Sequence, residues 1–291
     1  MRIGELLRDG KVHLSCEIFP PKKFDGIAQA EAVAREIADL RPDFMSVTYG
    51  AAGSTPGHTL RIAQAVQSCG VEPLCHLTCV QSTREHVRQV LDDLQSSGIR
   101  NVLALRGDLP KEGEPAHDFT YAAELVEFIH RQGDFCIGAA CYPEGHPESG
   151  GRMKDVEFLR RKVDAGVDFL TTQMFFDNGI LYNFLYRMLR AGVNVPVCAG
   201  VMPICDARQV DRVMKLSGSL MPPRFAAIAD RFAHDPAAMA QAGVAFATEQ
   251  IVDLIANGVN NIHLYTMNRP WIARAIMNNL SNVIRPADSK E

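Results

Sequence analysis

One carboxylate, Glu17, interrupts an apolar stretch near the start of the chain, which reads S-C-E-I-F-P-P over residues 15–21. An unpaired carboxylate in the interior of a protein costs several kcal/mol, or it takes up a proton. Phe19 and the two prolines after it predict a crowded, apolar surrounding. Glu17 is therefore difficult to explain as a structural residue, and it is the first candidate for chemistry.

Polar and ionisable side chains also end other apolar stretches of the sequence. His76 stands in H-L-T-C, Arg106 and Asp108 in L-R-G-D-L-P, and Tyr142 and His146 in Y-P-E-G-H-P. Structural alternatives exist for these residues: a local ion pair of Arg106 with Asp108, a hydrogen-bonded core histidine for His76, and turn packing for the tyrosine and histidine. Further candidates at the ends of such stretches are Thr48, Gln173 and Arg269.

The elements that would position these residues are strands alternating with amphipathic helices. Apolar residues recur at spacings of three and four in the helical patterns, for example over residues 27–40, 83–95, 155–165 and 206–216. Several helices end at a glycine, where the left-handed conformation closes a helix. The predicted strands are Val12–Phe19, Phe44–Thr48, Pro73–Thr78, Val102–Leu105, Cys136–Cys141, Phe169–Met174, Val195–Gly200 and Asn261–Tyr265.

This alternation predicts parallel strands, whose two buried faces explain why the stretches are almost wholly apolar. Eight such units favour an α/β fold of the (β/α)8 TIM-barrel type over an open doubly wound sheet. We expect extra helices before the eighth strand, at residues 221–232 and Pro236–Ala256, and a terminal helix at residues 270–280. We see no linker, which predicts a single domain over residues 1–291. In such barrels the active site forms at the carboxyl ends of the strands, where the candidates converge.

Composition excludes several classes of function. The 291 residues carry 30 basic and 34 acidic side chains without a basic block, so nucleic acid and membrane surfaces are not expected partners. The charged N-terminus does not resemble a signal peptide, and we expect a cytoplasmic protein. Cysteines within apolar stretches, without a C-x-x-C motif, predict buried free thiols and no metal site. Motifs of P-loop enzymes, Rossmann dehydrogenases, serine hydrolases and zincins are missing.

The order and spacing of these segments resemble a known family. E-I-F-P-P, S-V-T-Y-G-A, H-L-T-C, L-A-L-R-G-D-L-P, Y-P-E-G-H-P, R-K-V-D-A-G, Q-M-F-F-D and Y-T-M-N-R together resemble the bacterial 5,10-methylenetetrahydrofolate reductases, over residues 4–280. The resemblance implies a flavoprotein barrel with non-covalent FAD, which passes hydride from NADH or NADPH to methylenetetrahydrofolate by a ping-pong sequence. The product, 5-methyltetrahydrofolate, supplies methyl groups for methionine synthesis. Small-molecule substrates and a homo-oligomeric state are implied as well.

The resemblance also implies roles for individual residues. Glu17 would be the general acid that opens the imidazolidine ring of the folate, and it would contact the substrate; this role requires burial to raise its pKa. Asp108 would accept a hydrogen bond from the pterin, stabilise the developing cation and disfavour an anionic flavin. Substrate or nicotinamide contacts would be Gln173, Gln209 and Arg269. Contacts to FAD would be Thr48, His76, Arg106, Gly107, Asp108, Tyr121, Ala140, Tyr142, His146, Asp155 and Lys162.

One position departs from the pattern of these reductases. Val213 stands where related bacterial enzymes have a phenylalanine that stacks on nicotinamide, which leaves the choice between NADH and NADPH open. The chain ends soon after the terminal helix, so we expect no regulation by S-adenosylmethionine. Two other functions compete with the reductase: a folate-binding barrel methyltransferase without flavin, and a non-catalytic carrier of folate or flavin.

Overall fold

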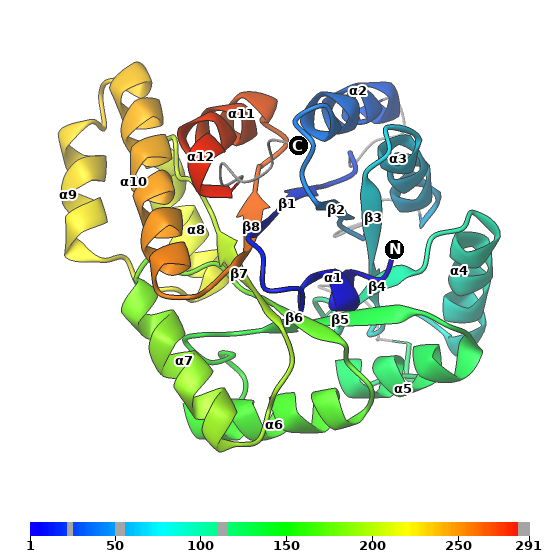
Figure 1. Cartoon of the computed structure of the whole chain (residues 1–291). Coiled ribbons are helices and arrows are strands. Elements are labelled where there is room, and N and C mark those ends of the chain that lie inside the picture. The colour runs from blue at the N-terminus through cyan, green and yellow to red at the C-terminus, as the bar shows by residue number, and fades with distance from the viewer. Residues whose placement is uncertain (22–25, 50–55, 110–115, 285–291) are drawn as a thin grey trace.

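The computed structural model describes residues 1–21, 26–49, 56–109 and 116–284. Eight parallel strands form a closed barrel in the order β1 to β8, and β1 pairs with β8 to close it. Helices surround the barrel (Figure 1). The strands are β1 His13–Ile18, β2 Phe44–Val47, β3 Glu72–Thr78, β4 Asn101–Leu105, β5 Cys136–Cys141, β6 Phe169–Thr172, β7 Val197–Val201 and β8 Asn261–Tyr265. The predicted TIM barrel is confirmed, with every predicted strand within three residues of its observed ends.

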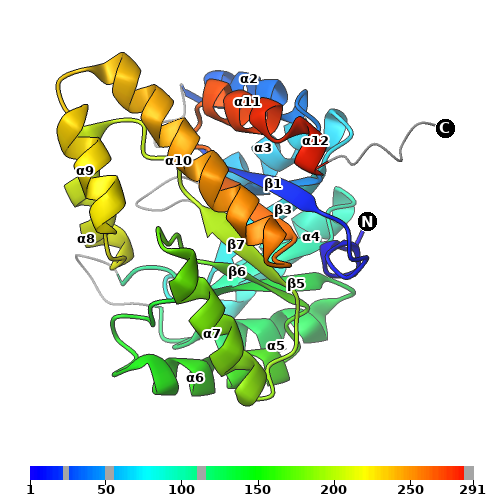
Figure 2. The same cartoon turned by 60° about the vertical axis from the view of Figure 1, so that its left-hand side comes forward.

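The helices follow the strands around the barrel (Figure 2). They are α1 Ile3–Leu6, α2 Ile27–Ala38, α3 Pro56–Ser68, α4 Arg84–Ser96, α5 Ala122–Gln132, α6 Arg152–Asp164, α7 Asn178–Arg190, α8 Val210–Ser217, α9 Pro223–Arg231, α10 Pro236–Ala256, α11 Pro270–Asn279 and α12 Ser281–Ile284, with a short 3-10 turn, η2, at Ala207–Gln209. The extra helices α9 and α10 before β8 are as predicted. No helix in the described ranges is both long and apolar enough to cross a membrane.

Local sequence explains where these helices begin and end. The side chain of Thr83 accepts the amide hydrogen of His86 at the start of α4, and Asp235 accepts that of Ala238 at the start of α10. The glycines expected to close helices have positive φ: Gly98 74°, Gly166 115°, Gly192 74° and Gly258 81°. Each of these turns returns the chain from a helix towards the next strand.

Alternate residues of the strands face the helices or the inside of the barrel. Outward residues such as Cys16, Val47 and Leu77 are buried under the surrounding helices in the main hydrophobic core. The half of the barrel interior nearer the amino ends of the strands is filled by apolar side chains, those of Phe44, Leu74, Leu103, Cys136, Phe169 and Cys198. These residues stand at or near the start of their strands, so the amino end of the barrel is packed with apolar side chains.

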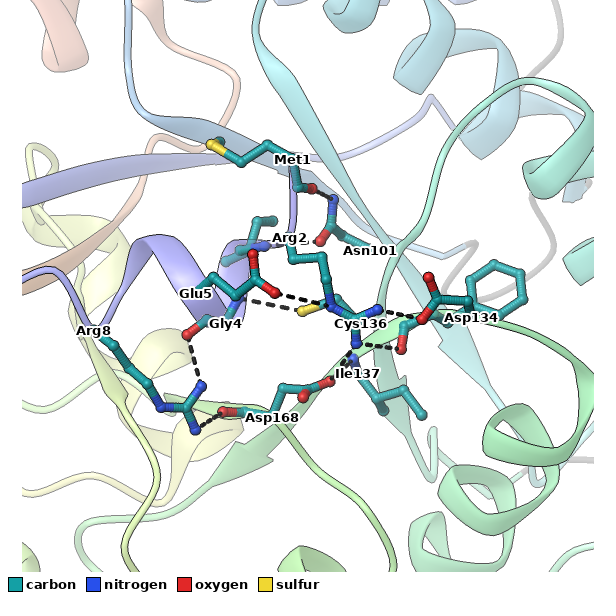
Figure 3. Close-up of polar contacts among 12 residues, drawn as sticks. Met1, Arg2, Gly4, Glu5, Arg8, Asn101, Asp134, Cys136, Ile137 and Asp168 are labelled. Atoms are coloured by element: carbon teal, nitrogen blue, oxygen red, sulfur yellow. Dashed lines mark hydrogen bonds and ion pairs between the residues drawn. The ribbon is translucent and has the colours of Figure 1, made fainter.

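Helix α1 covers this amino end of the barrel. Ile3 is fully buried against these apolar side chains, and the Gly4 amide donates to Sγ of Cys136 over 3.2 Å. Arg2 binds Asp134, and Arg8 donates to the carbonyl oxygens of Gly4 and Asp168 (Figure 3). The polar contacts hold α1 across the strand ends while Ile3 fills the space beneath it.

The cysteines that were expected to be buried thiols are confirmed as such. All eight cysteines are free, and Cys16, Cys75, Cys79, Cys136, Cys141 and Cys198 are buried. Burial raises the pKa of Cys16 and Cys75 to about 12, so both thiols stay protonated at neutral pH. Among the described residues, no group of three or more His, Cys, Asp or Glu could hold a metal ion.

Candidate active site

Glu17 lies on the inner face of β1, with polar side chains from three other strands around it. Its Oε2 is 3.4 Å from Oγ of Ser46, 3.6 Å from Nε2 of His76 and 3.5 Å from Nε2 of His263. The Glu17 side chain is 19% exposed, whereas the two imidazoles are almost fully buried. The parallel register places Glu17 beside Ser46 on β2 and beside Tyr265 on β8. The carboxylate predicted from the sequence therefore lies inside the barrel, in the half nearer the carboxyl ends of the strands.

The expectation that burial raises the pKa of Glu17 is wrong for this surrounding. Burial does act to raise the pKa, but the hydrogen bond with His263, the charge of His76 and the Ser46 hydroxyl outweigh it and lower the pKa of Glu17 below its ordinary value. The pKa of His76 is itself lowered by burial to about 4, so its ring is neutral at pH 7. Among the groups that lower the pKa of Glu17, the hydrogen bond with His263 contributes most.

A hydroxyl on β1, the strand that carries Glu17, fixes the orientation of His263 on β8. Oγ of Ser15 donates to the carbonyl oxygen of Ile262 over 3.1 Å and lies 2.7 Å from Nδ1 of His263. Because Ser15 has one hydroxyl proton, Nδ1 carries the hydrogen of the second bond. Nε2 of His263 then faces Oε2 of Glu17 at 3.5 Å and Oγ of Ser46 at 3.3 Å.

Ser15, Ser46 and His263 are functional candidates that the sequence reasoning missed. Each stands inside a strand, not at its end, and the search for candidates was directed at strand ends. The two-residue repeat of a strand could have identified two of them. Ser15 precedes Glu17 by two residues, and His263 precedes Tyr265 by two. Alternate residues of a strand share a face. A polar residue two positions before a rim residue therefore points into the same barrel.

His76 is buried, as the alternative of a core histidine predicts, but one of its ring nitrogens lacks a hydrogen bond among the described residues. The residue is 7% exposed, and its Nε2 has no hydrogen-bond partner within the described parts of the chain. A buried polar atom without a partner is uncommon and costs free energy. This nitrogen is therefore available to a ligand that enters the barrel from the carboxyl end.

The segment after β4 presents a guanidinium and a glycine together. Arg106 does not pair with Asp108, as the structural alternative suggested; its guanidinium binds the Glu148 carboxylate instead. Gly107 has φ 82°, and a Cβ at this position would lie 2.9 Å from Cβ of Thr78. Asp108 is exposed, and its carbonyl oxygen accepts a hydrogen bond from Gln81. The backbone here lies too close to β3 for a side chain at position 107.

The loop after β5 holds a second group of candidates. The rings of Tyr142 and His146 stand edge to face with centroids 4.6 Å apart, as the turn-packing alternative predicted, although this packing does not preclude ligand contact. Nζ of Lys162, on α6, donates to the carbonyl oxygen of Ala140 over 2.8 Å. Burial lowers the pKa of Lys162 and raises that of Asp155, on the same helix. An ammonium and a carboxyl group thus lie beneath this loop.

The three candidates for substrate contact come from different connections of the barrel. Gln173 directly follows β6, and its Oε1 accepts the amide hydrogen of Met174. Gln209 belongs to η2 after β7, and Arg269 immediately precedes α11 after β8. All three are partly exposed. They stand on the same end of the barrel as Glu17, since each follows the carboxyl end of its strand.

Thr48 and Tyr121 complete the sequence-predicted set, and they lie farther from the centre. Thr48 follows β2, where its amide donates to Ile18 and its carbonyl oxygen accepts from Thr59. Tyr121 stands at the start of α5 and is 63% exposed. Residues 50–53 of the T-Y-G-A-A-G segment lie outside the described ranges.

This geometry agrees with the comparison against protein families. The family model described as methylenetetrahydrofolate reductase matches residues 2–281, which is nearly the whole chain. The chain belongs to the methylenetetrahydrofolate reductase family.

Curated methylenetetrahydrofolate reductases from several kingdoms are similar to the chain. The 5,10-methylenetetrahydrofolate reductase of Pectobacterium carotovorum is 34% identical over 278 residues, covering 95% of this chain and 92% of that protein. The Escherichia coli enzyme is 33% identical over 279 residues, covering 95% and 93%. A maize relative named methylenetetrahydrofolate reductase (NADH) 1 is 36% identical, and the match covers 98% of this chain but 52% of that protein.

A solved structure with much lower sequence identity has the same barrel fold. An uncharacterised protein from Clostridium thermocellum, described as binding two copies of 5-methyl-5,6,7,8-tetrahydrofolic acid, aligns with a TM-score of 0.66 at 12% identity. The alignment covers 98% of this chain and 99% of that one. It supports the fold of the methylenetetrahydrofolate reductase family seen here.

Val213, which departs from the pattern of the reductases, is buried beside the mouth of the barrel. It lies on α8, is 8% exposed and belongs to a cluster with Phe176, Met202 and Phe225. A valine here completes the packing of α8 on the connection after β7. The structure therefore gives Val213 a packing role.

Proposed function

We propose that the chain reduces 5,10-methylenetetrahydrofolate to 5-methyltetrahydrofolate with non-covalently bound FAD and a reduced nicotinamide. The reductase family supports the reaction class. The observation that carries the assignment to this site is the Glu17 carboxyl group, held inside the mouth of the barrel against Ser46, His76 and His263.

The residues present fit a flavin dinucleotide. Arg106 and Lys162 supply positive charge for its phosphate groups, and arginine binds phosphate through two parallel hydrogen bonds. Gly107 leaves the backbone without a side chain beside Thr78. The unpartnered Nε2 of His76 offers a polar atom to a ring that enters the barrel. Thr48, Gly107, Asp108, Tyr121, Ala140, Tyr142, His146 and Asp155 are the further proposed contacts.

FAD, when bound, accepts hydride from the nicotinamide and delivers it to the folate. Relatives from maize and Arabidopsis are named NADH enzymes, and we therefore propose NADH as the preferred donor. The protein need not hold both reactants at once, because Gln173, Gln209 and Arg269 line one end of the barrel and can serve each in turn.

Glu17 supplies the proton that the reaction needs. The methylene carbon of the substrate bridges two nitrogens, and hydride can attack this carbon only after one carbon–nitrogen bond breaks to give an iminium cation. Glu17 protonates the leaving nitrogen, and Nε2 of His263, 3.5 Å from Oε2 of Glu17, lies close enough to take part in replacing this proton. A substrate that covers Glu17 excludes water, which favours the neutral acid. Asp108 supplies negative charge for the cation.

The decisive test uses the flavin as the reporter. Purified protein, reconstituted with FAD if necessary, should show flavin absorption, lose it anaerobically on addition of NADH, and regain it on addition of methylenetetrahydrofolate. Parallel additions of NADH and NADPH measure the preference. Absence of flavin binding and of bleaching would reject the reductase assignment and would favour a folate methyltransferase without flavin.

A further inference from the structure

Arg106 is already engaged by a carboxylate from another loop. Its Nη1 lies 2.5 Å from Oε2 of Glu148, and its Nη2 donates to Oε1 over 3.2 Å. Two parallel bonds of this kind occupy one edge of a guanidinium completely. The Arg106 side chain is 26% exposed and that of Glu148 is 58% exposed, so both ends of the pair are accessible from solvent.

The loop after β5 is built to present Glu148. The Glu148 amide donates to Nδ1 of His146 over 3.1 Å, and both the amide and the hydroxyl of Ser149 bond to the carbonyl oxygen of His146. Edge-to-face contact with Tyr142 fixes the same histidine ring. The turn is thus held by its backbone and by His146, while the Glu148 side chain contributes only the contact with Arg106.

A carboxylate and a phosphate are alternative partners for the same guanidinium edge. Both offer two oxygens at the spacing of the two N–H groups, and both are anionic. The hydrogen bond with Glu148 accordingly raises the pKa of Arg106, and the same bond lowers the pKa of Glu148. A phosphate of the cofactor cannot take this edge of Arg106 until Glu148 leaves it.

We propose that the Arg106–Glu148 pair is a latch, in which Glu148 stands in for a cofactor phosphate and must release Arg106 before a dinucleotide binds. The proposal rests on the proposed function, because it takes FAD as the ligand of Arg106. Glu148 then weakens FAD binding by competition. It also holds the Arg106 guanidinium in one orientation before the cofactor binds.

Substitution of Glu148 tests the latch through binding alone. Glu148→Ala should lower the dissociation constant of FAD about two- to fivefold, the change expected from losing one exposed competing ion pair. Glu148→Gln, which keeps the shape and removes the charge, should act in the same direction. Flavin fluorescence titrated against the flavin-free full chain measures the constant. The matched control is Glu157→Ala, which removes one exposed negative charge from the adjacent helix α6.

Salt dependence separates competition from a structural effect. In the wild-type chain a phosphate replaces a carboxylate on Arg106, so the number of ion pairs stays constant and added salt changes this part of the affinity little. In Glu148→Ala the phosphate forms a new ion pair, so the dissociation constant should rise more steeply with salt. In Arg106→Ala, the further change Glu148→Ala should have no effect on FAD affinity.

Two results would overturn the latch. Glu148→Ala with the same FAD affinity as Glu157→Ala, or with weaker affinity, would show that Glu148 does not compete, while FAD binding by the wild-type chain would leave the proposed function intact. A wild-type chain that binds no FAD at all would instead contradict the proposed function, and the latch with it.

Discussion

Oε2 of Glu17 and Nε2 of His263 lie 3.5 Å apart across the seam where β1 and β8 close the barrel. This contact joins two residues that are 246 positions apart in the chain. The pair stands on the inner face of the barrel, below the mouth through which a substrate enters.

Glu17→Gln should separate the two half-reactions. The amide keeps the shape of the side chain but has no acidic proton, so FAD binding and reduction by NADH should stay near wild type. Reduction of methylenetetrahydrofolate should fall by about two to four orders of magnitude, the usual contribution of a general acid. Rapid-mixing absorbance of the flavin measures each step. An equal loss in both steps would assign Glu17 to the fold or to the flavin instead.

His263→Gln should move the pH profile of the folate step. His263 contributes the hydrogen bond that lowers the pKa of Glu17, so its loss raises that pKa. A general acid works while it is protonated, and the falling limb of the rate should therefore shift to higher pH. The nicotinamide step should keep its profile. His130→Gln, at an exposed position on α5, is the control, and a shift of the same size in that variant would remove His263 from the mechanism.

The pH dependence of stability should follow His13 at the opposite end of β1. Its ring lies 2.8 Å from Asp9 and 2.9 Å from Asp43, and these two carboxylates raise its pKa although burial opposes them. A raised folded-state pKa stabilises the protein fully below the unfolded value of about 6.5, and this contribution is lost as the pH rises through the folded-state value. The urea concentration at the midpoint of unfolding should therefore decrease as the pH is raised from 6 to 9.

The variant His13→Gln isolates this effect. At pH 6 it should lose about 1.5 to 3 kcal/mol of unfolding free energy, because a buried group bonded to two carboxylates is removed. The difference in unfolding free energy between this variant and the wild type should become smaller as the pH rises. The reason is that the wild-type chain then loses the stabilisation from charged His13. A difference between the two proteins that does not vary with pH would show that His13 is neutral throughout.

Gly243→Ala should destabilise the fold close to the substrate residues. A Cβ at this position of α10 would lie 2.2 Å from the carbonyl oxygen of Ile204, which is backbone and cannot move alone. We expect a loss of about 1 to 3 kcal/mol, as for an overpacked core. The same displacement should raise the KM for folate, because Ile204 leads into Gln209. Denaturant unfolding and steady-state kinetics measure the two effects.

Gly57→Ala provides a comparison within another helix. A Cβ on Gly57, in α3, meets no atom of the described residues within 4 Å. Alanine is a better helix former than glycine, so this variant should be as stable as the wild type or slightly more stable. A similar loss in both variants would attribute the effect at Gly243 to something other than the contact with Ile204.

The sequence predicted the barrel well because its signals are local. The strands Cys136–Cys141 and Asn261–Tyr265 and the helix Pro236–Ala256 have the predicted bounds, since turn residues and apolar periodicity mark them directly. Glu17 was predicted for the same reason: a charge inside an apolar stretch is visible in one segment. Its position inside the barrel, near the carboxyl ends of the strands, follows from the fold.

The electrostatics of the site could not be predicted in this way. The pKa of Glu17 depends on Ser46, His76 and His263, which lie on three other strands, and burial alone predicted the wrong direction. The partner of Arg106 is likewise distant, 42 residues away at Glu148, whereas the sequence suggested the nearby Asp108. Side chains brought together by barrel closure determine both properties.

Helix α1 covers the amino end of the barrel, opposite the end at which Glu17 lies. Ile3 and Gly4 press on the apolar layer at the amino end, and the contacts of Arg2 and Arg8 fasten the helix there (Figure 3). In the reaction that we propose, a donor and an acceptor of hydride that both need the centre of the barrel would reach it from the one end at which Glu17 lies. The first would then leave before the second binds, and the four-residue helix at the opposite end would be the structural reason for that order.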